Sequence, residues 1–133
     1  MADRPLYAAD THSLLWYLHA PKRLGPAATS AFAEIESGQA DLIVSVIVIA
    51  EIIYILQAGK VNADFDEVLA RLQASPNVVI APLTTERVAE LNTATAVPEM
   101  HDRMIAVEAK ASGATLITYD QAITASGFVP TVW

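Results

Sequence analysis

The sequence predicts an α/β fold in which a central parallel sheet lies between two layers of helices. Short apolar runs that suit strands alternate along the chain with stretches of helical spacing, the pattern of doubly wound domains. The chain has 133 residues, of which 53% are hydrophobic and 17% charged, so it can bury one core and is too apolar to be disordered. We therefore expect one domain over residues 1–133, with three α/β/α layers.

In the first half of the chain, two predicted strands are each followed by helices. Residues 6–9 are short and apolar, and residues 11–19 place leucines on one helical face. Residues 46–57 are ambiguous, because their β-branched side chains favour a strand while their length favours a helix, which we prefer. The other elements expected here are a helix over 26–37, a strand over 42–45 and a helix over 64–74.

The second half continues the alternation. A helix over 84–92 begins at Thr84 as its cap and is expected to carry Arg87 on its outer face. Strands that are joined through helices run parallel, so this half extends the same sheet. Its other expected elements are a strand over 77–81, a helix over 101–112, a strand over 115–119, a short helical turn and a last strand near 128–133.

Two acids directly follow predicted strands. Asp10 closes the strand at 6–9, and Asp120 closes the strand at 115–119. Doubly wound folds keep their binding sites at the carboxyl ends of parallel strands, so both side chains are candidate site residues. Each also precedes a helical stretch, and an N-cap is the alternative role for each.

Two further acids lie on predicted helices. Glu51 is surrounded by apolar residues in IVIAEIIYIL, where an unpaired buried carboxylate would be costly. The alternatives for Glu51 are a helix edge that reaches solvent or an arginine partner. Asp102 begins the helix in HDRMIAVEA, where it could instead stabilise the helix dipole or pair with Arg103.

All four acids can face one crevice of a right-handed parallel sheet. Carboxylates held together repel one another and would need cations to stay ionised. Oxygen ligands select hard ions such as Mg²⁺ or Mn²⁺, and such an ion can activate water and stabilise a phosphoryl oxyanion. The candidate metal and catalytic residues are therefore Asp10, Glu51, Asp102 and Asp120.

Composition narrows the remaining possibilities. The chain has no cysteine, which excludes thiolate zinc sites and cysteine nucleophiles and fits a cytoplasmic protein. We expect neither a signal peptide nor a membrane span, because the longest apolar stretch, 42–56, is interrupted by Ser45 and Glu51. A net charge of −7 disfavours a broad basic nucleic-acid surface and suggests a locally bound substrate or a basic partner.

Three segments together resemble the PIN domain, and especially the VapC-type toxins of toxin–antitoxin pairs. They are YAADTHSLLWYL, SVIVIAEIIYIL and HDRMIAVEAKASGATLITYD, and their order and spacing cover almost the whole chain. The resemblance implies a PIN-like α/β/α fold, a homodimer, Mg²⁺- or Mn²⁺-dependent endoribonuclease activity and a small antitoxin partner. By motif match it also implies an acidic site made of Asp10, Glu51, Asp102 and Asp120.

The resemblance extends to neighbouring polar side chains. Thr118 matches the hydroxyl residue of the last motif and is expected to support a carboxylate, and Thr11 and Ser45 are candidates for similar roles. The loop AVPEMHDR before Asp102 is shorter than is usual in the family. Glu99 in this loop is therefore either an auxiliary ligand or a solvated acid.

Several other residues are weaker candidates. Lys22 and Arg23 are our candidates for phosphate contact, with ordinary solubilising charge as the alternative. Trp16 and Tyr17 are expected to pack in the core or a dimer, or else to stack on a base. The three histidines, His12, His19 and His101, are not spaced as a zinc site. For His12 and His101, which flank acids, proton transfer is the alternative to a structural role.

Three other functions are consistent with parts of the pattern. A housekeeping PIN nuclease would have no antitoxin. A Mg²⁺-binding phosphoacceptor signalling domain would need paired acids near the start of the chain and a lysine at a late strand end, and the sequence has neither. A catalytically silent interaction module would have no need of the four acids.

Overall fold

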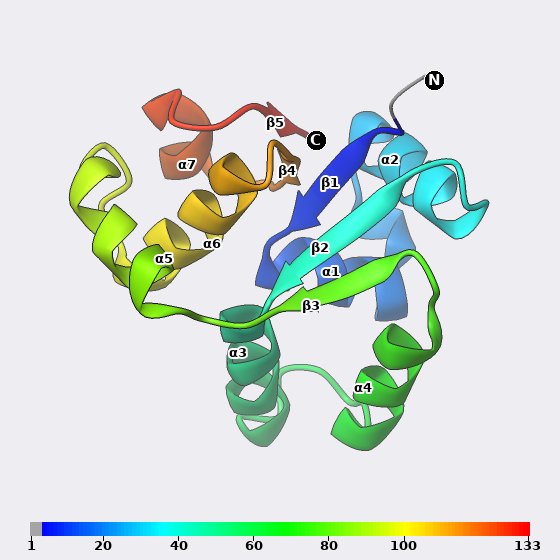
Figure 1. Ribbon diagram of the computed structural model, residues 1–133. Helices are drawn as coiled ribbons and strands as arrows, with labels where there is room; N and C mark the ends of the chain where they lie inside the picture. Colours follow the sequence, from blue (N-terminus) through cyan, green and yellow to red (C-terminus); the bar gives the residue numbers. More distant parts are fainter. Residues whose placement is uncertain (1–3) are drawn as a thin grey trace.

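The computed structural model describes residues 4–133, and the strands in this range form one parallel sheet (Figure 1). The strand order is β3-β2-β1-β4-β5, and every neighbouring pair is parallel, as the sequence predicts. Tyr7 of the central strand pairs with Leu42 on one side and Thr115 on the other. The strands are β1 (Leu6–Ala9), β2 (Asp41–Ser45), β3 (Val78–Ala81), β4 (Thr115–Ile117) and β5 (Thr131–Val132).

Helices cover both faces of this sheet. The chain moves toward β3 after β1 and returns toward β5 after β3, and right-handed crossovers place the two sets of helices on opposite faces. Figure 1 shows two helices of the first set, α1 (Thr11–His19) and α2 (Pro26–Glu36), behind the sheet next to β1 and β2. The helices are α1 (Thr11–His19), α2 (Pro26–Glu36), α3 (Val46–Gln57), α4 (Phe65–Ala74), α5 (Thr85–Ala89), α6 (Met100–Ala111) and α7 (Gln121–Ser126).

The hydrophobic core fills the space between the sheet and these helices. Leu14 of α1 and Phe32 of α2 are buried on one face, while Ile105 of α6 packs with the other. Residues 46–57, for which the sequence left strand and helix open, form the helix that we preferred. Ile52 of this helix is fully buried in the core. In the described part of the chain, none of the helices is long and apolar enough to cross a membrane.

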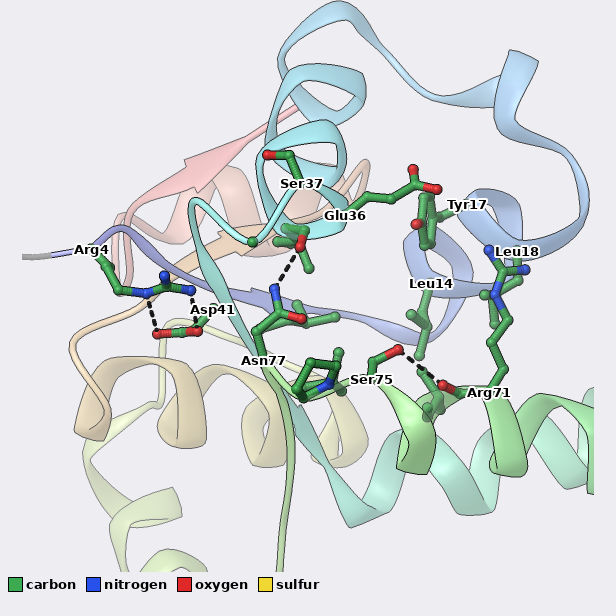
Figure 2. Close-up of a pocket in the computed structure, with 16 residues that line it drawn as sticks. Arg4, Leu14, Tyr17, Leu18, Glu36, Ser37, Asp41, Arg71, Ser75 and Asn77 are labelled. Atoms are coloured by element: carbon green, nitrogen blue, oxygen red, sulfur yellow. Dashed lines mark hydrogen bonds and ion pairs between the residues drawn. The ribbon is translucent and has the colours of Figure 1, made fainter.

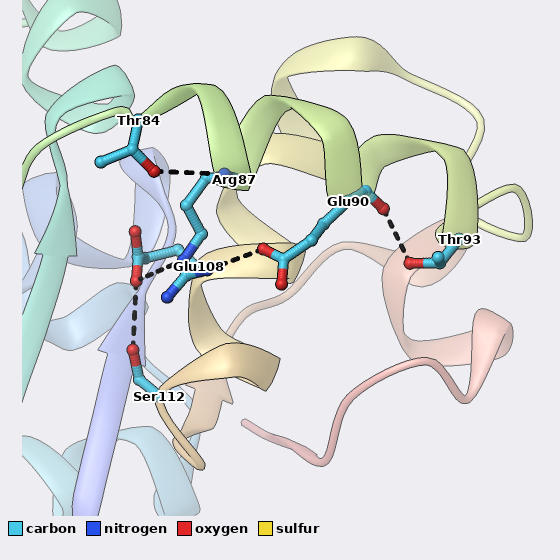
Figure 3. A network of polar contacts seen from close by, with 6 residues as sticks. All are labelled: Thr84, Arg87, Glu90, Thr93, Glu108 and Ser112. Atoms are coloured by element: carbon cyan, nitrogen blue, oxygen red, sulfur yellow. Dashed lines mark hydrogen bonds and ion pairs between the residues drawn. The ribbon is translucent and has the colours of Figure 1, made fainter.

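The position expected for Arg87 was wrong. Its guanidinium turns inward from α5 and donates through Nε to Glu108 Oε2 at 3.3 Å and through Nη1 to Glu90 Oε1 at 2.8 Å (Figure 3). Glu108 is only 7% exposed and also accepts from the Ser112 hydroxyl at 3.1 Å. A buried carboxylate on α6 needs a cation, so Arg87 joins α5 to α6 instead of facing solvent.

Two predicted elements end at least two residues earlier than expected. The helix predicted over 84–92 is α-helical only to Ala89, and the chain continues as a 3-10 turn over Glu90–Thr93. Strand β4 ends at Ile117, two residues before the predicted end at 119. At this end the hydroxyl of Thr118 accepts a hydrogen bond from the backbone N–H of Asp120 at 3.0 Å, which turns the chain toward α7.

Candidate metal centre at the carboxyl edge of the sheet

All four predicted acids line one cleft of about 490 Å³. Two of them come from loops at the carboxyl ends of the adjacent strands β1 and β4, and two come from α3 and α6. The topology therefore brings together positions that are up to 110 residues apart in the chain, from 10 to 120. These side chains are Asp10, Glu51, Asp102 and Asp120.

Asp10 is held on both of its carboxylate oxygens. Oδ1 accepts from the backbone N–H of Ser13 at 3.0 Å and so caps α1, while Oδ2 accepts a short hydrogen bond from the hydroxyl of Thr118. The Ser13 hydroxyl donates to the carbonyl of Ile117 at 2.8 Å, which ties the first turn of α1 to β4. The N-cap role is therefore real, and it fixes a carboxylate that also lines the cleft.

Thr118 lies between two of the acids. Its side chain is 1% exposed, donates to Asp10 and accepts from the backbone N–H of Asp120. Asp120 in turn caps α7, with Oδ1 accepting from the Ile123 N–H at 2.9 Å. The structure thus gives Thr118 the carboxylate contact that the resemblance implies, and one buried hydroxyl sets the spacing of two acidic loops.

Glu51 is not buried among apolar residues as its sequence context suggests. It is half-buried on the edge of α3 that faces the cleft, and its Oε1 accepts from the hydroxyl of Thr11 at 2.6 Å. Thr11 therefore has the supporting contact considered for it. Ser45 does not: its hydroxyl accepts from the Ile47 N–H at 3.3 Å and caps α3, and within residues 4–133 it bonds none of the four acids.

Glu99 is the N-cap of α6, which begins one residue earlier than predicted. Its two oxygens accept from the backbone N–H groups of Asp102 at 3.0 Å and His101 at 2.9 Å, and Oε2 also lies 2.8 Å from His101 Nδ1. Burial raises the pKa of Glu99, but these hydrogen bonds outweigh burial and lower it below its usual range. The hydrogen bond that the His101 ring donates to Glu99 also raises the pKa of His101.

Asp102 carries the clearest electrostatic sign of the site. Burial, followed by repulsion from Asp120, Glu99, Glu51 and Asp10, raises the pKa of Asp102 to about 6. The ion pair considered for it is absent from the described residues, because Arg103 donates its Nε to the carbonyl of Val97 instead.

The donor chemistry of the cleft fits a hard divalent cation. Within residues 4–133, the Asp102 carboxylate accepts no protein hydrogen bond, and Glu51 Oε2 and Asp120 Oδ2 are equally unbonded. These are oxygen ligands of the kind that Mg²⁺ and Mn²⁺ prefer. No group of three or more ligand side chains among the described residues is close enough to hold an ion together, whereas Mg²⁺ is commonly bound by one or two carboxylates and completes its shell with water.

The rim of the cleft is aromatic. Trp16, Tyr119 and His12 line it, and the Arg23 guanidinium lies 4.4 Å from the centroid of the Trp16 ring. Trp16 therefore faces the site instead of the core, whereas Tyr17 stacks on the core residue Phe32 with centroids 4.3 Å apart. Lys22, His19 and His12 are exposed. Sequence reasoning missed Tyr119, although its place between Thr118 and Asp120 in LITYD was a signal.

A larger cleft, of about 570 Å³, lies near the amino ends of β2 and β3 (Figure 2). Its polar groups already have partners: Arg4 pairs with Asp41 at 2.7 Å, and the Asn77 amide donates to the carbonyls of Ile35 and Ala40 at 2.5 and 2.7 Å. Arg71 also lies over the Tyr17 ring, 5.5 Å from its centroid. The acidic cleft, with its unbonded carboxylates, is therefore the better candidate for chemistry, despite its smaller volume.

Comparison with known protein families matches residues 7–128 to the PIN domain. The chain belongs to the PIN domain family. The match spans all four acids of the cleft, strands β2 to β4, and β1 from its second residue. No curated protein matches the chain.

Solved structures with the same fold come from toxin–antitoxin complexes. VapBC2 from Rickettsia felis, bound to a DNA fragment from its promoter, superposes with a TM-score of 0.68 at 16% identity, covering 96% of this chain and 97% of that one. FitAcB from Neisseria gonorrhoeae and a toxin–antitoxin complex from Klebsiella pneumoniae each give a TM-score of 0.60 at 18% identity, covering 96% of both chains. At these identities the likeness shows the PIN fold alone.

The raised pKa of Asp102 predicts a stability cost that depends on pH. Below about pH 4 the carboxyl is protonated in both the folded and unfolded chain, and above about pH 6 it is ionised in both, with repulsion only in the folded chain. Without metal, the wild type should lose stability as pH rises across this window. Asp102→Asn should raise the free energy of unfolding at neutral pH by about 1–2 kcal/mol, after discounting for the partial exposure of Asp102.

Thermal melts of both proteins, in chelator and in Mg²⁺, measure this effect. Mg²⁺ should stabilise the wild type more than Asp102→Asn, because binding to the folded state alone shifts the unfolding equilibrium. A variant that melts lower than the wild type in chelator, with an equal Mg²⁺ shift in both, would show that this carboxylate is structural.

Proposed function

We propose that the protein is a Mg²⁺- or Mn²⁺-dependent endoribonuclease that hydrolyses phosphodiester bonds of RNA. The single observation that carries this proposal is the cleft in which four carboxylates from four elements meet. Burial, followed by repulsion from the neighbouring carboxylates, raises the pKa of Asp102 there. Membership of the PIN domain family, whose members are typically nucleases, supports the proposal. We further propose that residues 1–133 form a single nuclease domain that acts in the cytoplasm.

The proposed cation ligands are Asp10, Glu51, Asp102 and Asp120. When bound, the cation supplies a water of lowered pKa and a positive charge for the phosphoryl oxygens. The chain itself orients the ligands: the helix caps fix one oxygen each of Asp10 and Asp120, and Thr11 fixes one oxygen of Glu51. Asp102, without a protein hydrogen bond among the described residues, is the carboxylate freest to adjust to the ion.

Thr118 is the proposed positioning residue of the site. Its buried hydroxyl holds Asp10 Oδ2 and the backbone N–H of Asp120, so both loops keep the same separation. Thr11 does the same for Glu51, while Ser45 only caps a helix. Lys22 and Arg23 remain the proposed phosphate contacts, and the position of Arg23 over Trp16, which lines the cleft, supports its role.

We also propose that the protein is the toxin of a toxin–antitoxin pair and forms a homodimer. Support comes from the solved relatives, which are complexes of toxins with antitoxins. An apolar groove of about 500 Å³ adjoins the acidic cleft, sharing His12 and Glu51 with it and continuing along α3 past Tyr54, which is 75% exposed. Such a surface suits a partner segment that reaches the carboxylates with a basic side chain.

Cleavage of RNA in Mg²⁺ or Mn²⁺, and none in chelator, is the first expected result. Glu51→Gln should abolish it, because the change keeps the shape of the side chain and removes the charge that holds the cation. Glu67→Gln, at an exposed glutamate in the first turn of α4, is the matched control and should cleave like the wild type. The assay is gel analysis of labelled RNA with end-group determination.

The products should carry 5′-phosphate and 3′-hydroxyl ends, because water is the proposed nucleophile. Products with 2′,3′-cyclic phosphate, or equal cleavage in chelator, would contradict a metal-activated water. Cleavage would also separate this proposal from a phosphoacceptor domain and from a silent interaction module, neither of which cuts RNA.

Expression of the protein alone should slow cell growth, and co-expression with the product of a small neighbouring reading frame should restore it. The reason is that the partner would cover the cleft and its carboxylates. Growth curves of strains carrying the wild type, Glu51→Gln and the pair measure this. Equal growth in all strains, together with RNA cleavage in vitro, would leave a housekeeping PIN nuclease as the function.

A further inference from the structure

Three aromatic rings meet at one side of the acidic cleft. The centroids of Trp16 and Tyr119 are 6.2 Å apart, those of Tyr119 and Trp133 are 5.3 Å apart, and those of Trp16 and Trp133 are 5.6 Å apart. Trp16 lies on α1, Tyr119 lies in the loop after β4, and Trp133 directly follows β5. We call these three residues, with Arg23 over Trp16, the aromatic shelf.

The aromatic shelf is fixed by the backbone around it. The carbonyl of Trp133 accepts from the N–H groups of Ala27 at 2.8 Å and Ala28 at 3.1 Å, in the first turn of α2. Gly25 permits this approach, since a Cβ there would lie 2.6 Å from the Trp133 carbonyl oxygen. These backbone contacts with the start of α2 hold Trp133 in place, and its ring packs against the rings of Trp16 and Tyr119.

Tyr119 is the exposed member of the shelf. Its side chain is 57% exposed, although its neighbour Thr118 is 1% exposed and bonds two of the acidic loops. Both Tyr119 and Trp16 line the cleft with the four acids. More than half of the Tyr119 side chain is thus open to solvent directly beside the carboxylates, although the ring also contacts Trp16 and Trp133.

The net negative charge of the chain explains why an uncharged aromatic surface would help to bind RNA here. The chain carries eight Lys and Arg residues against fifteen Asp and Glu, and the cleft itself is acidic, so general attraction cannot hold a polyanion near it. Stacking of a base on an aromatic ring does not depend on net charge. Arg23 is the cation at this rim and can meet a phosphate or the edge of a stacked base.

We propose that the aromatic shelf binds a nucleobase of the RNA next to the scissile phosphate, with Tyr119 as the residue that stacks on the base. This inference rests on the proposed nuclease function and names substrate-contacting residues outside the acidic cluster. Tyr119 offers its ring to the base, and Arg23 lies beside it as a cation for the adjoining phosphate. Bases inside a duplex are already stacked on both faces and cannot reach the ring, so a duplex serves as the control ligand in the binding test.

Intrinsic fluorescence gives a readout of this site that does not depend on cleavage. The chain has two tryptophans, Trp16 and Trp133, and both belong to the shelf. A base that stacks on Tyr119 should therefore quench the fluorescence of the whole protein. The titration uses an unstructured RNA of about 12 nucleotides, and separately the same strand in a perfect duplex, added to Glu51→Gln protein in Mg²⁺ so that the RNA stays intact.

Three variants in this background decide the role of Tyr119. Tyr119→Leu should weaken single-strand binding about tenfold, the loss expected for one base–aromatic stack. Tyr119→Phe keeps the ring and should bind like the parent protein. Val79→Thr changes an exposed apolar side chain of β3, outside the acidic cleft and the apolar groove, and is the control that should also bind like the parent. In the cleaving protein, Tyr119→Leu should raise KM about tenfold and change kcat within about twofold.

The duplex should bind more weakly than the single strand and be insensitive to Tyr119→Leu. Quenching by single strands in a protein that cleaves no RNA would sustain the base-binding shelf while the nuclease proposal falls. Cleavage with an unchanged KM in Tyr119→Leu would support the nuclease proposal and overturn the base-binding shelf. The shelf would also be overturned if single strand and duplex lost affinity equally, or if Tyr119→Leu altered only the oligomeric mass in sedimentation, which would assign the surface to a second copy of the chain.

Discussion

The mutual repulsion of four carboxylates is the constraint on which the rest of this structure depends. Acids that face one another in a partly buried cleft destabilise the folded chain unless a cation joins them. The fold opposes this repulsion with local hydrogen bonds: helix N-termini hold Asp10 and Asp120, and threonine hydroxyls hold Asp10 and Glu51. Asp102 alone is left without such a bond among the described residues, and burial together with repulsion from the neighbouring carboxylates raises its pKa.

The parallel sheet and the place of the acids could be predicted from the sequence because both follow from local patterns. Alternating apolar and helical stretches predict parallel strands, although not their order in the sheet, and acids just after parallel strands gather at one edge. The inward turn of Arg87 could not be predicted, because Glu108, the buried acid that attracts it, is 21 residues away and its burial depends on tertiary packing. The N-cap at Glu99 was missed because glutamate is an uncommon cap, and only the three-dimensional course of the loop brings its carboxylate to two N–H groups.

Acidic and aromatic features of the site complement each other. A cleft that concentrates negative charge for a cation repels the phosphates of its proposed substrate until that cation is bound. Tyr119 and Trp16 provide contact surface that carries no charge, and Arg23 provides one cation at the rim. The apolar groove that continues along α3 offers separate surface for a protein partner, so RNA and partner would compete mainly at the carboxylates.

Direct binding of Mn²⁺ tests the central claim that these carboxylates form a cation site. Electron paramagnetic resonance measures free Mn²⁺ as the metal is titrated into the protein at neutral pH, without any need for substrate. The wild type should remove Mn²⁺ from solution at a defined stoichiometry, Asp10→Asn should lose most of this binding, and Asp66→Asn, at an exposed acid of α4, should retain it. Equal Mn²⁺ binding by all three proteins, or none by the wild type, would contradict the assignment.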